Sequence, residues 1–166
     1  MRKNDMSNNT NNTIPEWTEK VRIYNIPDCK MVSSGDGFFG QENFTRFNKW
    51  FSKQTVFPIY SFDFLREGDK PGTLNWNYIY DERMDVPNGL EIVDFKGGYY
   101  AVITGIDGVD TTAAYKIRDE YLEKHNLVID GSRPSFGHIL SGYELIKETL
   151  GTGQMDYWFP VKRVEQ

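Results

Sequence analysis

The hydrophobic pattern of this 166-residue chain passes twice through the same order of elements, strand–strand–helix–strand–strand. Val21 to Ile26 alternates as a strand does, and Phe44, Phe47, Trp50 and Phe51 have the spacing of one face of a helix. The pattern predicts strands over 21–26, 29–34, 56–65 and 74–80 around a helix over 41–54, and then strands over 90–95, 99–104, 136–146 and 155–164 around a helix over 111–125.

The two halves can be laid over each other, with Ile23 on Ile92 and Phe47 on Ile117, so the order of elements indicates an internal duplication. A polar stretch over 81–89, ending in the turn signal Pro87-Asn88-Gly89, separates them. Two such units predict an α+β fold, an antiparallel sheet with two main helices on one side. The interface between the halves is then a natural place for a ligand cleft.

Composition narrows the class of protein. A hydrophobic share of 39% and an aromatic share of 15% are enough for a packed core. The net charge of −5 argues against a general nucleic-acid-binding surface, because phosphate binding needs a basic face. No apolar run approaches the roughly 20 residues of a membrane span, and the N-terminus lacks the apolar region of a secretory signal, so we expect a cytoplasmic protein.

The first 14 residues are polar and Asn-rich, which predicts a disordered tail before a domain over 15–166. Cys29 is the single cysteine and there are 2 histidines, so neither an internal disulfide nor a Cys-based or His-rich metal site is expected, and no cofactor is expected.

Catalytic motifs are weak. The chain holds no G-x-S-x-G, HExxH, P-loop or EF-hand pattern. Gly35-x-Gly37-x-x-Gly40, with Asp63 roughly twenty residues on, formally matches a dinucleotide fingerprint. The segment before it is short and polar, unlike a buried parallel strand, so a plain strand-to-helix loop is the favoured interpretation.

Aromatic residues are the informative excess. Trp76, Tyr78 and Tyr80 share a strand face, and further aromatics gather in the second half, where Tyr99, Tyr100, Tyr143, Tyr157 and Trp158 lie. Such rings either pack in the core or bind flat hydrophobic ligands and cations. Glu144 is the single acidic residue of the strand expected over 136–146, and is either a surface residue or a buried counter-charge for a cation.

Three stretches carry a family resemblance: Val93-Asp94-Phe95-Lys96-Gly97-Gly98-Tyr99-Tyr100-Ala101-Val102, the pair Tyr143-Glu144, and Met155-Asp156-Tyr157-Trp158-Phe159-Pro160-Val161. Over residues 18–164 the chain resembles the GyrI-like domain, the effector-binding domain of AraC-type and MerR-type multidrug-responsive regulators. The resemblance implies tandem duplicated β-α-β-β modules of the SHS2 kind, here over about 18–84 and 89–164, with the ligand cleft between the modules.

The resemblance also implies site residues. Glu144 matches the buried glutamate that serves drug-binding members as a counter-charge for cationic aromatic ligands. Trp158 matches the aromatic residue of the last strand, and Trp76 and Tyr78 resemble aromatics that face the cleft. Tyr143 and Tyr100 complete the expected ligand-binding set.

The chain departs from the family in two ways. Ile146 stands where the family usually has a tyrosine, and about twenty residues before the domain are too few for a helix-turn-helix. We therefore expect a stand-alone effector-binding domain for a hydrophobic, aromatic or cationic small molecule, linked to transcription regulation or drug response in a bacterium, without direct binding to nucleic acid or membrane. Two alternatives stay open: an interaction protein that inhibits DNA gyrase or acts in trans with a DNA-binding regulator, and a hydrolase that uses the cleft glutamate to activate water.

Overall fold

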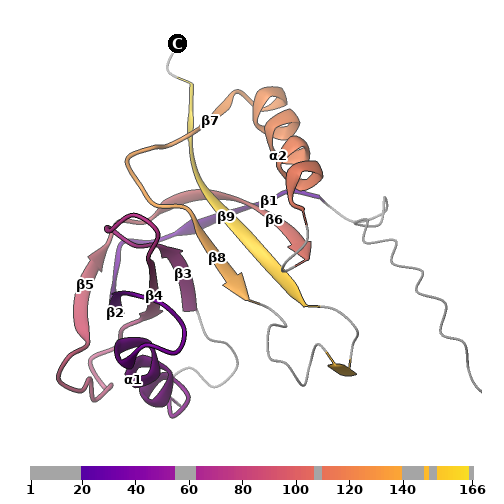
Figure 1. Ribbon diagram of the computed structural model, residues 1–166. Helices are drawn as coiled ribbons and strands as arrows, with labels where there is room; N and C mark the ends of the chain where they lie inside the picture. The colour runs from indigo at the N-terminus through magenta and orange to yellow at the C-terminus, as the bar shows by residue number, and fades with distance from the viewer. Residues whose placement is uncertain (1–19, 55–62, 107–109, 140–147, 150–152, 165–166) are drawn as a thin grey trace, which may run out of the picture.

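The computed structural model describes residues 20–54, 63–106, 110–139, 148–149 and 153–164, and Figure 1 shows their arrangement. Two helices, α1 (Glu42–Phe51) and α2 (Thr112–Lys124), accompany one large sheet. The strands are β1 (Arg22–Ile26), β2 (Cys29–Gly37), β3 (Asp63–Glu67), β4 (Leu74–Ile79), β5 (Glu91–Phe95), β6 (Gly98–Ile106), β7 (Leu127–Ile129), β8 (Phe136–Ile139) and β9 (Gln154–Arg163).

The strand order is β1-β6-β9-β8-β3-β4-β2-β5, and β7 pairs with β9 beside this path. Every pairing between the described strands is antiparallel. The edge strand β1 pairs with β6 from the second half of the chain, and the other edge strand, β5, pairs with β2 from the first half. The chain is therefore an α+β protein built on an antiparallel sheet, as its sequence pattern predicts.

Both helices pack on the same face of the sheet, as the strand register shows. On β9, Phe159 and Val161 lie in the core under α2, so Trp158, one residue before Phe159, faces the other way. Trp158 pairs with Phe136 across β8, and the register through β3 and β4 then places Tyr78 on the helix side, under α1.

The opposite face, which we call the helix-free face, carries a core of its own. Six buried side chains form it: Met31, Phe64, Tyr100, Val102, Phe136 and Trp158. The sheet is thus apolar on both faces, which accounts for the high aromatic content of the chain.

Most predicted elements are present, with differences at their ends. The strand expected over 56–65 is described from Asp63 and runs on to Glu67, and the one expected over 136–146 is described as far as Ile139. The strand β7 was not predicted. The tail over 1–14 lies outside the described residues.

The glycine-rich segment before α1 is not a free loop, because β2 continues to Gly37. A register shift between Ser33 and Asp36 accompanies Gly35, whose φ of 69° is in the left-handed region that favours glycine. The antiparallel pairing of β2 with β4 and β5 excludes the parallel strand that a dinucleotide fingerprint requires.

No described helix is long and apolar enough to cross a membrane. In the same part of the chain, no group of three or more His, Cys, Asp or Glu side chains is arranged to hold a metal ion.

Candidate functional site

The four described members of the predicted ligand-binding set, Trp76, Tyr78, Tyr100 and Trp158, do not come together at one place. Glu144 and Tyr143 lie outside the described residues. Trp76 and Tyr78 pack under α1 on the helix-covered face, whereas Tyr100 and Trp158 belong to the core of the helix-free face. The reason is strand alternation: the register from β9 through β8 and β3 to β4 aligns Trp158 with Asn75. Trp76 and Tyr78 are one and three residues further along β4, so their side chains point to the opposite face.

Trp76 is the centre of an aromatic cluster on the helix-covered face. Its ring centroid lies 5.0 Å from that of Phe47 and 5.6 Å from that of Phe51, both on α1. Phe39, which precedes the helix and is 55% exposed, lies 5.5 Å away. Trp76 itself is half-buried, so this cluster, which we call the Trp76 cluster, extends from the core to the surface.

A carboxylate lies beside this cluster. The indole Nε1 of Trp76 donates a hydrogen bond of 3.0 Å to Oδ2 of Asp63. Nε2 of His138 lies 3.7 Å from Oδ1 of the same carboxylate. The side chains of Asp63 and His138 are 14% and 16% exposed, so the negative charge is largely removed from water. Burial, with a smaller contribution from the Asp63 charge, raises the pKa of Tyr78.

In the sequence, Asp63 is the acidic residue of a weak dinucleotide match, and the sequence pattern does not predict it as a site residue. Its register partner is Tyr78, and this pairing brings its carboxylate to the aromatic face of β4. The apolar alternation of the strand after α1 and of β4 is a signal that could have found Asp63. Pairing the two strands by this alternation places Asp63 opposite an aromatic residue of β4.

On the helix-free face, Tyr100 and Trp158 lie together, with ring centroids 6.2 Å apart. Phe136 packs against both rings and against Phe64, with its centroid 4.9 Å from that of Tyr100 and 4.2 Å from that of Phe64. The buried hydroxyl of Tyr100 and the buried Nε1 of Trp158 have no hydrogen-bond partner in the described part of the chain. Burial raises the pKa of Tyr100, and the nearby Arg133 charge opposes this rise.

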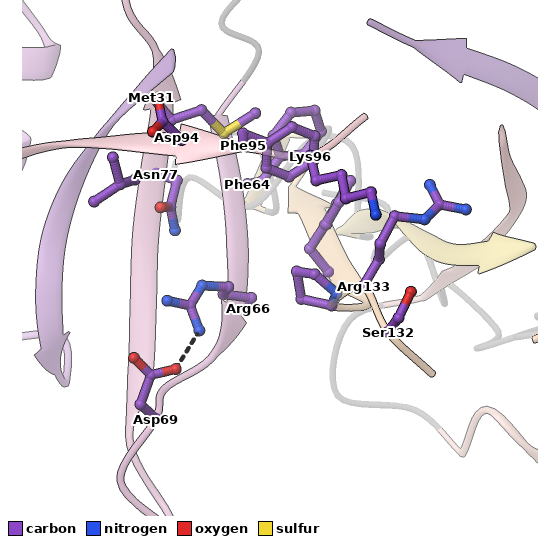
Figure 2. Close-up of a pocket in the computed structure, with 13 residues that line it drawn as sticks. Met31, Phe64, Arg66, Asp69, Asn77, Asp94, Phe95, Lys96, Ser132 and Arg133 are labelled. Atoms are coloured by element: carbon purple, nitrogen blue, oxygen red, sulfur yellow. Dashed lines mark hydrogen bonds and ion pairs between the residues drawn. The ribbon is translucent and has the colours of Figure 1, made fainter. Parts of the chain in front are cut away.

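A pocket of about 380 Å³ opens beside this core (Figure 2). Segments far apart in the sequence form it. They are the strands β2, β3, β4 and β5 with Asp69 and Lys96 in the adjoining turns, the turn before β8, and the first residue of β8. Its apolar lining consists of Met31, Phe64, Val93, Phe95, Pro134 and Phe136, and its polar lining of Arg66, Asp69, Asn77, Asp94, Lys96, Ser132 and Arg133.

The three basic side chains of the pocket, Arg66, Lys96 and Arg133, differ in how firmly other described residues hold them. Arg133 is fixed, because its Nε donates to Asp130 at 2.9 Å and its Nη atoms donate to three backbone carbonyl oxygens. Its guanidinium also lies over the Tyr100 ring, 4.9 Å from the centroid. Arg66 pairs with the exposed Asp69 at 3.1 Å, as Figure 2 shows. Lys96 is exposed and makes no ion pair with another described residue.

Comparison of the chain with family models and with curated proteins finds no match. Solved structures do match it. The EcmrR C-terminal domain superimposes with a TM-score of 0.58 at 11% identity, over 87% of this chain and 98% of that domain. EcmrR in its complex with DNA gives 0.57 at 12% identity, over 87% of this chain and 58% of that one. A protein from Listeria innocua described as a hydrolase gives 0.59 at 14% identity, over 86% of this chain and 92% of that one.

These likenesses establish the fold. It is the fold of the EcmrR C-terminal domain, and it agrees with the architecture that the resemblance to GyrI-like domains implies.

Proposed function

We propose that the chain is an effector-binding domain that takes a hydrophobic, aromatic and cationic small molecule on the helix-covered face of the sheet. One observation carries the proposal: the Asp63 carboxylate, 14% exposed, accepts a hydrogen bond from Trp76 at the edge of an aromatic cluster. No arginine or lysine of the described chain forms an ion pair with it.

A lipophilic cation gains from both parts of this arrangement. Ring faces attract a cation through their quadrupole. A carboxylate that is largely removed from water interacts more strongly with a cation than an exposed one does. The imidazole of His138, at 3.7 Å, compensates the charge only when it is protonated. A cationic aromatic ligand therefore finds a carboxylate that has no arginine or lysine partner among the described residues, beside a flat apolar surface.

We also propose that the domain consists of the two tandem duplicated modules expected from the sequence. The strand order supports a tandem duplication, because it has an internal symmetry. Exchanging β1 with β5, β2 with β6, β3 with β8 and β4 with β9, and then reading the order backwards, gives the same order again. In a duplicated domain over 15–166, we place the ligand between the two modules, where β3 meets β8. Asp63 and His138 lie at this junction, one from each half.

The role of Glu144 as a counter-charge stays a prediction, and so do the walls expected from Tyr143, Tyr100 and Trp158. Asp63 adds a second carboxylate to the proposed site. Among the described residues, no particular geometry favours the gyrase-inhibitor or the hydrolase alternative.

The test replaces the carboxylate and keeps its shape. In Asp63→Asn we expect the affinity for the cationic dye rhodamine 6G to fall about tenfold, as for the loss of a partly desolvated charge partner. The neutral dye N-phenyl-1-naphthylamine should bind the variant and the wild type equally. Fluorescence anisotropy measures the first dye and fluorescence enhancement the second. Glu144→Gln, in the same assay, tests the residue implied by the resemblance.

Asp119→Asn is the matched control, because it removes an acidic charge from the surface of α2, where Asp119 is 62% exposed. It should leave both affinities unchanged. Equal binding of rhodamine 6G by wild type and Asp63→Asn would exclude Asp63 as the counter-charge.

A further inference from the structure

We propose that the pocket on the helix-free face is a second ligand site, and that it takes an aromatic carboxylate. This site is separate from the proposed cation site and does not depend on it. Asp63 and Phe64 are consecutive residues of β3, and their side chains point to opposite faces of the sheet. The cation site and the pocket thus lie back to back on the same strand.

The shape of the pocket suits a flat apolar molecule. Its volume of about 380 Å³ lies in the range of small-molecule sites. Phe64, Phe95 and Phe136 supply the apolar wall, and the Phe95 and Phe136 centroids are 6.0 Å apart. Figure 2 shows the Phe64 and Phe95 side chains at the centre, with Arg66 on one side and Lys96 on the other. An aromatic ring against this wall would have a basic side chain at either end.

The charges of the lining favour an anion. Lys96 makes no ion pair with any described side chain. Arg66 is 24% exposed, and its partner Asp69 is 83% exposed. A pair with one such exposed member is worth little, so Arg66 can exchange it for a ligand carboxylate at small cost.

The two acidic side chains of the lining do not compete for a cation. Asp69 is turned toward Arg66 by their ion pair (Figure 2). Asp94 is exposed and lies beside Met31, on the other side of Phe95 from Lys96 (Figure 2). Arg133 adds positive charge at the wall, and Asp130 next to it offsets that charge.

The requirement for a carboxylate can be separated from the requirement for an aromatic ring. We expect 2-naphthoate to bind the wild-type protein in a saturable way, measured by isothermal titration calorimetry. 2-Naphthamide, which keeps the ring system and lacks the charge, should bind about tenfold more weakly. Lys96→Gln and Arg66→Gln should each weaken 2-naphthoate binding about tenfold and leave 2-naphthamide binding unchanged.

Lys116→Gln is the control, since Lys116 is a surface residue of α2 whose side chain is 77% exposed. Circular dichroism establishes that each variant is folded. The proposal fails if 2-naphthoate does not bind the folded wild type, or if both pocket variants bind it as tightly as the control does. Rhodamine 6G binding by the same variants keeps this outcome apart from the cation site, because Lys96→Gln and Arg66→Gln should leave that affinity intact.

Discussion

Asp130 and Arg133 attach the turn before β8 to the rest of the sheet. Asp130 accepts hydrogen bonds from the Ser132 hydroxyl at 2.7 Å and from Arg133 at 2.9 Å. Arg133 in turn donates to the carbonyl oxygens of Gly97, Tyr99 and Val161. Arg133 is 8% exposed, and buried polar groups of this kind need hydrogen-bond partners. These bonds hold the wall of the pocket in place.

The carboxyl of Asp130 makes stability depend on pH. The hydrogen bonds from Ser132, and then those from Arg133, hold its pKa well below its usual range. The contribution to stability is fully present above the unfolded-state pKa of about 3.9, and it is lost as the pH falls toward the lower folded-state value. In Asp130→Asn we therefore expect lower stability near neutral pH and a difference from wild type that closes below about pH 4.

Urea unfolding over a series of pH values measures this difference. Glu91→Gln, at an exposed position of β5, should show no such convergence with wild type. A constant difference between Asp130→Asn and wild type down to low pH would mean that the carboxyl charge is not the source of the stabilisation.

A sequence pattern predicts well which residues of one strand share a face of the sheet. It predicts less well which residues of different strands share a face, because that depends on how the strands pair. The prediction that Trp76 and Tyr78 share a face is confirmed, because they are two residues apart in one strand and side chains alternate with a period of two. The relation of Trp158 to them depends on the register of three ladders, and no local pattern contains that register. Asp63 was missed as a site residue for the same reason.

At the scale of elements, α1 follows directly from its sequence. Phe44, Phe47 and Trp50 recur at helical spacing and are the buried residues of the helix. The helix α2 has a weaker pattern and buries Leu122 most deeply, yet its position was also predicted. The strand β7 has three residues, too few for alternation to be recognised, and its pairing with β9 joins segments on either side of the intervening strand β8.

Removal of the central apolar side chain of α1 should weaken its packing on the sheet. Phe47 is fully buried, and Phe47→Ala should lower the free energy of unfolding by about 3–5 kcal/mol. Thr45→Ala, on the exposed side of the same helix, should change it by less than about 0.5 kcal/mol. Urea unfolding followed by circular dichroism measures both. Similar values for the two variants would show that α1 contributes little to the stability of the core.

For the whole molecule, the order of strands links the two halves of the chain. Among the described strands, each edge strand comes from one half and pairs with a strand of the other: β1 with β6, and β5 with β2. Neither half can complete its own set of ladders without the other. The local patterns predict the elements and their order, but these long-range pairings are absent from any local pattern.

This linkage predicts one cooperative unfolding unit. Leu122→Ala removes a buried side chain of α2, and we expect it to accelerate amide hydrogen exchange in β2 of the first half as much as in β6 of the second. The backbone amides of Val32 and Val102 are suitable probes, since both residues are fully buried in the sheet. Faster exchange at Val102 with unchanged exchange at Val32 would instead indicate two independent units.

The position of β1 at the sheet edge also has a consequence during synthesis on the ribosome. Arg22 pairs with Val102, so β1 leaves the exit tunnel long before β6, its partner among the described strands, has been translated. Until then its apolar residues, Ile23, Tyr24 and Ile26, remain open to chaperones or to other nascent chains. Since β5 adds to the β3–β4–β2 part of the sheet before β6 is translated, the first half can assemble early, before β1 pairs. Capture of β1 by β6 would then be a late step in the maturation of the protein.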